Sequence, residues 1–351
     1  MFGKKKHRML NYSATISGLL FLFSCAPQKS DSGKGFTFSG NTQGTTYTII
    51  VAEDSIHFQQ EEIDGLLAAF DTVLSTYIPE SEISRLNVSE GNYAFKDTHS
   101  FFKNCYTISQ DVYRHSNGLF DPSVYPLVKA WGFFDKSEHV PDQQAIDSIL
   151  QFTGFENGKH HTVLFESDSV KFTKKDPRFK LDFNGIAQGY SVDVIADFIE
   201  SRGHRNYYVE IGGELRVKGK NREGKKWTIG IDAPTEESQG HMSITALSIS
   251  DCGMATSGNY RNFFEKDGKK YGHTLHPTTG KPIATDVLSA TVVAENAALA
   301  DAYATVFLIL GKENGLKFLE EHKNLGVLLI YVDGNNQLKI YTTIDQAEKT
   351  D

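Results

Sequence analysis

The stretch LDFNGIAQGYSVD, residues 181–193, has the composition of a strand that runs through a glycine-rich turn into a helix. Gly185 and Gly189 flank the junction, and Asp182 stands just before it. Such a turn presents backbone N–H groups and a helix N-terminus, both of which bind anions. The stretch lacks the Gly-Lys-Ser/Thr of a P-loop and the G-x-G-x-x-G of a dinucleotide-binding turn. It therefore predicts an anion site of another kind, with the carboxylate of Asp182 next to it.

Strands and helices are predicted around this stretch without strict alternation. Apolar residues recur every three or four positions between Ile56 and Tyr77, as in an amphipathic helix. The other expected helices are 99–116, 142–150, 185–202, 296–310 and 313–321. The expected strands are 45–51, 162–166, 169–173, 179–183, 206–211, 214–218, 226–231, 243–250, 253–257, 260–265, 270–275 and 287–294, with a hairpin at 326–341. This pattern and the length predict an α+β fold, with mixed, mostly antiparallel sheets, packed helices and two intertwined subdomains.

The N-terminus has the layout of a secretory signal. Four basic residues between positions 4 and 8 precede a short apolar stretch at 16–23, which is too short to span a membrane. The sequence LFSC (22–25) resembles a bacterial lipobox, in which Cys25 becomes the first mature residue and bears the lipid. The alternative is an ordinary signal peptide with an incidental cysteine. We expect a lipoprotein signal peptide at 1–24, a flexible tether at 25–35 and a single domain at 36–345.

The mature body is acidic. Removing residues 1–24 removes four positive charges and no acids, so the formal charge of −8 becomes −12 (−8 − 4). This balance argues against nucleic acid as a partner. Cys105 and Cys252 remain, and we expect buried free thiols, although pairing in an oxidising compartment stays open.

Glycine and polar residues gather in short stretches that indicate a phosphate-rich ligand. Within EIGGE (210–214) and TSG (256–258), glycines let the backbone approach a ligand closely. Asp301 and Thr305 are four residues apart and so share one face of a helix. Such an oxygen pair suits Mg²⁺ or Ca²⁺. The alternative is that Asp301 is a helix-end residue and Thr305 a core residue.

A series of short motifs extends over the whole mature chain. They are QGTTY (43–47), STYIPESEISRLN (75–87), GLFDPSVYPLVKAWGF (118–133), DFNGIAQGY (182–190), GGE (212–214), TSGNY (256–260), HTLHPTTGKP (273–282) and ADAYAT (300–305). Their order resembles that of the ApbE-type flavin transferases, lipoproteins that act as FAD:protein FMN transferases. The chain departs from the family pattern at four positions. Gln43 stands where the family commonly has Met, Gln188 where it often has Lys, and His276 where it has Asp. Ala304 stands where some members have Asp.

The resemblance implies a site for FAD and a metal ion. The turn after Asp182 would hold the metal and pyrophosphate side of FAD, with the Gly185 carbonyl, Asp301 and Thr305 binding Mg²⁺, or Ca²⁺ as the alternative. Tyr77 would lie against the isoalloxazine ring, unless it is only a core or rim tyrosine. The FAD-binding residues implied by the resemblance are Gln43, Tyr77, Leu119, Phe120, Asp121, Asp182, Gln188, Gly212, Gly213, Thr256, Ser257 and His273.

The implied reaction is transfer of FMN from FAD to a threonine or serine hydroxyl of a target protein, forming a phosphoester and releasing AMP. A base must take the hydroxyl proton, and His273 matches the family's catalytic histidine. The alternative is that His273 only packs in a hairpin, which is what we expect of His276. Two other functions stay open: an FAD pyrophosphatase that yields FMN and AMP, and a non-catalytic FAD-binding lipoprotein.

The resemblance also implies partners and a location. The acceptors would be flavin-carrying subunits of the Na⁺-translocating NADH:quinone reductase or of Rnf-type complexes. A lipid anchor would hold the protein in the cell envelope, on a periplasm-facing membrane surface, and would raise the effective concentration of membrane-bound acceptors.

Overall fold

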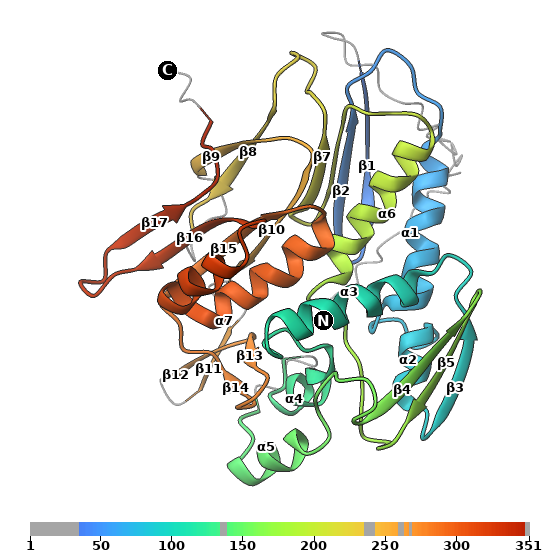
Figure 1. The fold of residues 1–351 in the computed structure, drawn as a ribbon, viewed down its shortest axis with the longest axis vertical. Coiled ribbons are helices and arrows are strands. Elements are labelled where there is room, and N and C mark those ends of the chain that lie inside the picture. The colour runs from blue at the N-terminus through green and yellow to red at the C-terminus, as the bar shows by residue number, and fades with distance from the viewer. Residues whose placement is uncertain (1–34, 134–138, 235–242, 259–262, 267–268, 348–351) are drawn as a thin grey trace, which may run out of the picture.

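The computed structural model describes residues 35–133, 139–234, 243–258, 263–266 and 269–347. Its centre is an antiparallel sheet with helices on one face and a two-stranded sheet on the other (Figure 1). In spatial order the central strands are β1 (Phe36–Thr42), β2 (Thr45–Val51), β6 (Tyr207–Ile211), β7 (Glu214–Lys218), β10 (Cys252–Gly258), β15 (Val287–Ala294), β16 (Gly326–Val332) and β17 (Leu338–Thr342). The expected α+β fold with antiparallel sheets is confirmed. The predicted signal peptide at 1–24 and Cys25, the first residue after it, lie outside the described residues.

The remaining elements surround this sheet. The helices are α1 (Gln60–Leu74), α2 (Glu82–Val88), α3 (Phe101–His115), α4 (Tyr125–Ala130), α5 (Gln143–Leu150), α6 (Ala187–Ser201) and α7 (Ala297–Glu321), with a 3₁₀ turn at Pro122–Val124. The smaller sheets are β3 (Asn92–Lys96), β5 (Ser169–Lys174) and β4 (His161–Glu166); β8 (Trp227–Asp232) and β9 (Ser243–Ile249); β11 (Phe263–Lys266) and β12 (Lys269–Gly272); and β13 (Leu275–His276) and β14 (Lys281–Pro282). Among the described residues, no helix is long and apolar enough to cross a membrane.

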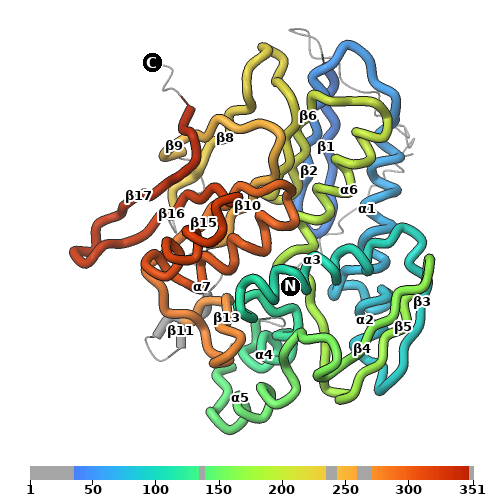
Figure 2. Tube along the Cα trace, in the orientation of Figure 1, coloured from blue at the N-terminus to red at the C-terminus, as the bar shows by residue number. Residues whose placement is uncertain are grey.

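The chain leaves the central sheet after β2 and returns to it at β6. In between it forms α1 to α5 and the β3–β5–β4 sheet, which Figure 2 shows beside the central sheet in blue to green. Helix α6 then leads back, and β6 pairs with β2. The two parts of the structure are thus built from interleaved segments of one chain.

The strands of the central sheet have two buried faces. On β7, Leu215 and Val217 pack in an apolar cluster with Trp227 and Leu247 of the β8–β9 sheet. Because side chains alternate along a strand, Arg216 points to the opposite face, where it donates a hydrogen bond to Asp193 of α6 at 3.2 Å. The alternation therefore directs the polar residues of β7 toward the helices.

Asp193 also fixes the start of α7 against α6. Its two carboxylate oxygens accept hydrogen bonds from the backbone N–H groups of Ala297 at 3.0 Å and Ala298 at 2.8 Å. A carboxylate at a helix N-terminus satisfies free N–H groups and opposes the positive end of the helix dipole. The N-cap residue, Asn296, satisfies a third N–H, that of Leu299. These bonds set the position of α7, which bears both residues of the predicted metal pair.

The contact between α6 and α7 requires a glycine. A Cβ added at Gly189 would lie 2.4 Å from the backbone oxygen of Ala297 and 2.8 Å from the Cβ of Asp301. Gly189→Ala should therefore lower the free energy of unfolding by about 1–3 kcal/mol, as overpacking does. Gly65 of α1 is a matched control, because a Cβ there meets no atom within 4 Å. Gly65→Ala should raise stability by up to about 1 kcal/mol. Urea denaturation measures both, and a gain in both variants would contradict this packing.

One predicted strand is wrong, and it is the one on which the opening stretch depends. Residues 179–183 form no strand, although Phe179, Leu181 and Phe183 are buried. Leu181 instead bonds with a side chain: its N–H donates to Asn87 Oδ1 at 2.8 Å, and its carbonyl accepts from Asn87 Nδ2 at 2.7 Å. The side-chain amide of Asn87 makes the hydrogen bonds that a neighbouring strand would otherwise make. The apolar residues therefore alternate here although no sheet forms.

Most other predicted elements are confirmed within a few residues. The two helices expected at 296–310 and 313–321 form α7, with non-helical backbone at Gly311 (φ 69°). Asp267 and Gly268, which were expected to turn the hairpin at 260–275, lie outside the described residues. The sequence did not predict β1, α2, β3, α4, β14 or the 3₁₀ turn at Pro122–Val124. Cys105 and Cys252 are both free, as expected, but only Cys105 is buried and Cys252 is partly exposed.

Candidate active site

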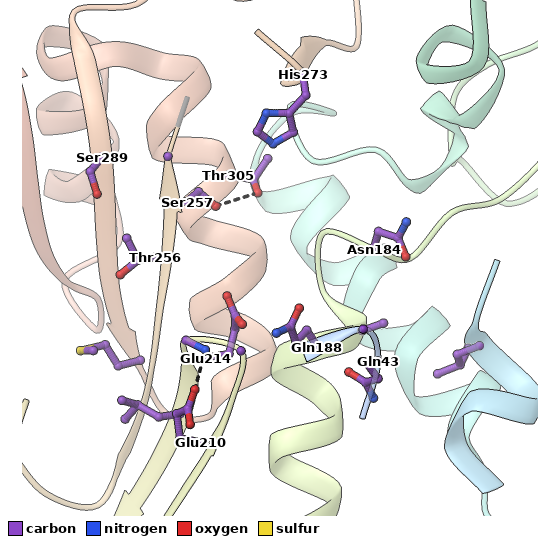
Figure 3. A pocket seen from close by; sticks show the side chains of 18 of the residues that line it. Gln43, Asn184, Gln188, Glu210, Glu214, Thr256, Ser257, His273, Ser289 and Thr305 are labelled. Carbon is purple, nitrogen blue, oxygen red and sulfur yellow. Dashed lines mark hydrogen bonds between the residues drawn. The ribbon is translucent and has the colours of Figure 1, made fainter. Parts of the chain in front are cut away.

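A cavity of about 1130 Å³ lies at the end of the central sheet where β6 turns into β7 (Figure 3). Gln188 and Thr305 line it from the helices, whereas Ile229 and Met254 line it from the side of the β8–β9 sheet. Nine of the site residues predicted from sequence line this cavity: Gln43, Tyr77, Gln188, Gly212, Gly213, Thr256, Ser257, His273 and Thr305. Segments from across the whole domain therefore meet at one site.

The turn between β6 and β7 brings backbone to the cavity wall. Gly212 (φ 62°) and Gly213 (φ 115°) adopt backbone conformations that favour glycine. A Cβ at Gly212 would lie 1.8 Å from Nε2 of Gln188, which donates to the Ile211 carbonyl at 2.9 Å. The glycines thus allow the turn to lie directly against the N-terminal turn of α6, and the predicted approach to a ligand stays a prediction.

The predicted metal-binding residues lie close together. Asp301 and Thr305 occupy successive turns of α7, and a Cβ at Gly185 would come within 4.0 Å of the Thr305 hydroxyl. Ser257 forms a hydrogen bond of 3.2 Å with that hydroxyl. Asp301 is buried, its Oδ2 accepts from the Gly189 N–H at 3.1 Å, and burial raises its pKa. Carboxylate, hydroxyl and carbonyl oxygens are the donors that Mg²⁺ and Ca²⁺ use, so these residues fit such an ion.

Within the described residues, no three His, Cys, Asp or Glu side chains form a group that could hold a metal ion. A zinc-type site of nitrogen and sulfur donors therefore has no support in that part of the chain. A site with one carboxylate from Asp301 and further oxygens from hydroxyl or backbone groups is compatible with this finding.

The turn within residues 181–193, which the sequence predicts to bind an anion, is held in place by the carboxylate of Asp182. Asp182 Oδ1 accepts from the backbone N–H of Asn184 at 2.9 Å, and Asn184 Nδ2 donates to the Tyr77 hydroxyl at 3.4 Å. Burial raises the pKa of Asp182 to about 6. Tyr77 is 69% exposed at the cavity, which leaves its ring face accessible to a ligand. Asp182 thus contributes to the cavity wall indirectly: it holds Asn184, and Asn184 bonds to Tyr77.

Six predicted residues do not line the cavity directly: Leu119, Phe120, Asp121, Asp182, Gly185 and Asp301. Phe120 is buried in the main core, against which Leu119 packs. Asp121 caps the turn at Pro122–Val124, because its Oδ1 accepts from the N–H of Ser123 at 2.7 Å and from its hydroxyl at 2.6 Å. The FAD contacts expected of these residues stay predictions.

The cavity is acidic. Its described lining contains four carboxylates, from Asp71, Glu210, Glu214 and Asp232, and no lysine or arginine. Burial raises the pKa of Asp71, Glu210 and Glu214. Among these described lining residues, an anionic ligand therefore meets no lysine or arginine side chain.

The two histidines of the motif at 273–282 differ in position. His273 lines the cavity, and its ring points inward on the side of Thr305 and Ser257 (Figure 3). His276 is not among the lining residues; its Nδ1 accepts from the N–H of Thr278 at 3.3 Å within the β13–β14 hairpin. The structure thus separates the two residues in the way that the sequence analysis expected.

Several lining residues were not singled out from the sequence. Asn184 and Glu214 lie inside quoted motifs, DFNGIAQGY and GGE, so their proximity to predicted residues was a usable signal. Tyr208, Ile229 and Ile231 also line the cavity, but nothing in the local sequence separates them from ordinary strand residues.

Comparisons with known proteins find relatives that match most of this chain. The ApbE family model matches residues 43–329. The FAD:protein FMN transferase of Vibrio cholerae is 34% identical over 93% of this chain and 95% of its own length, and that of Escherichia coli is 31% identical over 92% and 93%. The solved flavin transferase ApbE of Vibrio cholerae aligns with a TM-score of 0.74, 33% identity and coverage of 88% and 97%. The apo flavinyl transferase ApbE of Pseudomonas stutzeri aligns with a TM-score of 0.76 and 30% sequence identity, over 89% of this chain and 95% of its own. The chain therefore belongs to the ApbE family.

Proposed function

We propose that this protein transfers FMN from FAD to a threonine or serine hydroxyl of another protein. Membership of the ApbE family and the activity for which its relatives are named support this function. The cavity itself supports a large ligand, because about 1130 Å³ exceeds the usual range of small-molecule pockets. Its mixed lining also suits FAD, with Tyr77 and Ile229 for rings and the glycine turn and hydroxyls for phosphates.

The observation that carries the proposal is the charge of the cavity. FAD brings a diphosphate, whereas the described lining has four carboxylates and no basic side chain other than His273. We propose that a divalent cation offsets the repulsion between these charges, with Asp301, Thr305 and the Gly185 carbonyl as its ligands, Mg²⁺ as the ion and Ca²⁺ as the alternative. When bound, the cation withdraws charge from the phosphates and stabilises the leaving AMP.

His273 is the proposed base. It takes the proton of the acceptor hydroxyl as the oxygen forms a bond to the FMN-side phosphorus of FAD. The bond between that phosphorus and the bridging oxygen breaks, and AMP leaves with the electron pair. The products are a phosphoester of FMN on the acceptor and free AMP, so atoms and charge balance.

The test is incubation of the protein with FAD, Mg²⁺ and an acceptor domain that bears the target threonine. A gain in acceptor mass equal to one FMN, together with release of AMP, is the expected result. Release of FMN and AMP without a gain in acceptor mass would show an FAD pyrophosphatase instead. Binding of FAD with no product would show a flavin-binding lipoprotein.

The proposed acceptors are the flavin-carrying subunits of the Na⁺-translocating NADH:quinone reductase or of Rnf-type complexes. The proposed location is the cell envelope, where a lipid on Cys25 would hold the domain at a periplasm-facing membrane surface. The lipobox-like LFSC and the polar segment that follows it support this placement.

Cys25→Ser should abolish anchoring, because serine lacks the thiol that receives the lipid. In cells given labelled fatty acid, the native chain should incorporate label and the variant should not, and the variant precursor should stay unprocessed. Cys105→Ser is the matched control, since Cys105 is buried in α3 and should not affect labelling. Label on the Cys25 variant would contradict the assignment.

A further inference from the structure

Glu214 lines the cavity and belongs to the GGE motif, but the proposed reaction gives it no role. It is the first residue of β7 and follows the Gly212-Gly213 turn directly. Alternation along β7 places it on the same face as Arg216, which contacts Asp193 beside the start of α7. Figure 3 shows its carboxylate pointing from this turn toward α7, in the half of the cavity that Gln188 also lines.

The carboxylate of Glu214 lacks a partner on one of its oxygens. Oε2 is shielded from solvent and has no hydrogen-bond partner in the described structure. The neighbouring acid on the same turn is different, because Glu210 Oε1 accepts from the Gly213 N–H at 2.7 Å. A buried carboxylate oxygen without a partner costs free energy unless a proton or a cation occupies it.

Asp301 and Glu210 are the acidic groups whose charges act on Glu214. Burial first, and then repulsion by Asp301, raise the pKa of Glu214 well above its ordinary value. The basic residue on the same face of β7, Arg216, is committed elsewhere, to Asp193 and Asp197. Asp301 is buried and the Oε2 atom of Glu214 is shielded from solvent, so a divalent cation bound by both carboxylates would give this oxygen a partner.

We infer that Glu214 is a further carboxylate ligand of the divalent cation proposed at Asp301 and Thr305. This inference rests on the metal dependence of the proposed function and extends it to a residue in the β6–β7 turn. It gives the ion a second negative ligand, and it attaches the turn of Gly212 and Gly213 to α7 through the metal. Metal binding would thereby order the wall of the cavity before the diphosphate arrives.

The test is metal affinity, measured without turnover. Mn²⁺ is titrated into the purified protein and free Mn²⁺ is followed by electron paramagnetic resonance. Glu214→Gln, which keeps the size of the side chain and removes its charge, should weaken Mn²⁺ binding by about 10–100-fold. Glu223→Gln, which changes an exposed glutamate that does not line the cavity, is the control and should bind Mn²⁺ as the native chain does. Unchanged affinity in Glu214→Gln would overturn the inference.

Thermal unfolding gives an independent readout. Without metal, Glu214→Gln should melt at a higher temperature than the native protein, because repulsion between two buried carboxylates is removed. Saturating Mn²⁺ should then raise its melting temperature less than that of the native protein. A lower melting temperature without metal, with the full metal-induced rise, would show a structural role and overturn the inference.

The two proposals fail separately. If the native protein binds Mn²⁺ through Glu214 but transfers no FMN, the function is wrong and the ligand assignment stands. If the native protein transfers FMN and Glu214→Gln binds Mn²⁺ normally, the ligand assignment alone is wrong.

Discussion

His273→Ala is expected to lower the rate of FMN transfer by about 10²–10⁴-fold, which is the usual contribution of a positioned base. The imidazole lines the cavity on the side of Thr305, where the diphosphate of FAD would be held by the proposed metal site. Without it, the acceptor hydroxyl must lose its proton to water. FAD affinity should change little, because the metal and backbone groups supply most of the binding. Single-turnover transfer at saturating FAD measures the effect.

His276→Ala is the matched control for this experiment. The two histidines are three residues apart, but the His276 ring bonds to the N–H of Thr278 in the hairpin and is not among the residues lining the cavity. Its variant should retain most of the transfer activity. The native rate should fall at low pH as the base becomes protonated, and this fall should vanish only in His273→Ala. Normal transfer by His273→Ala at saturating FAD, with weakened FAD binding, would make His273 a nucleotide contact rather than the base.

Asp301→Asn should lower FMN transfer by about 10²-fold or more, since loss of the metal removes several kcal/mol of charge stabilisation in the transition state. The substitution keeps the shape of a side chain packed against Gly189, so the fold should persist. Activity should recover in part at high Mg²⁺, because the remaining oxygen ligands still bind the ion weakly. Steady-state transfer measured over a series of Mg²⁺ concentrations tests this.

Thr305→Val is the milder companion of that substitution. It removes a neutral hydroxyl, together with its 3.2 Å hydrogen bond to Ser257, and leaves the charged ligand in place. Its activity should therefore lie between those of the native protein and Asp301→Asn. Full activity of the native protein in the presence of a chelator would reject the metal role of both residues.

Local sequence patterns were enough to predict most of the secondary structure. The apolar repeat between Ile56 and Tyr77 lies within one turn or so of α1, and the strand expected at 45–51 is β2. Such patterns succeed because a helix or strand with one buried face must repeat its apolar residues with its own period. The unpredicted strand β1 and helix α2 have weaker patterns: β1 has a single buried residue, Phe38, and α2 has only seven residues.

The order of motifs was likewise enough to predict the family and nine of the residues that line the cavity. Short motifs succeed here because a ligand-binding wall requires particular residue types, such as the glycines at Gly212 and Gly213, whatever lies around them. The spacing of Asp301 and Thr305 also sufficed to place them on one helix face.

Only the tertiary structure shows which groups lie next to these residues in space. Residues 179–183 have the alternation of a strand, yet Asn87, some ninety positions earlier, supplies the hydrogen bonds and no sheet forms. The acidity of the cavity depends on bringing Asp71, Glu210, Glu214 and Asp232 together from three separate regions of the chain. Glu214 belongs to the GGE motif, but only the fold shows that its Oε2 atom is shielded from solvent without a hydrogen-bond partner. Periodicity and motifs are properties of neighbours along the chain, whereas burial and charge repulsion depend on neighbours in space, which only the folded structure defines.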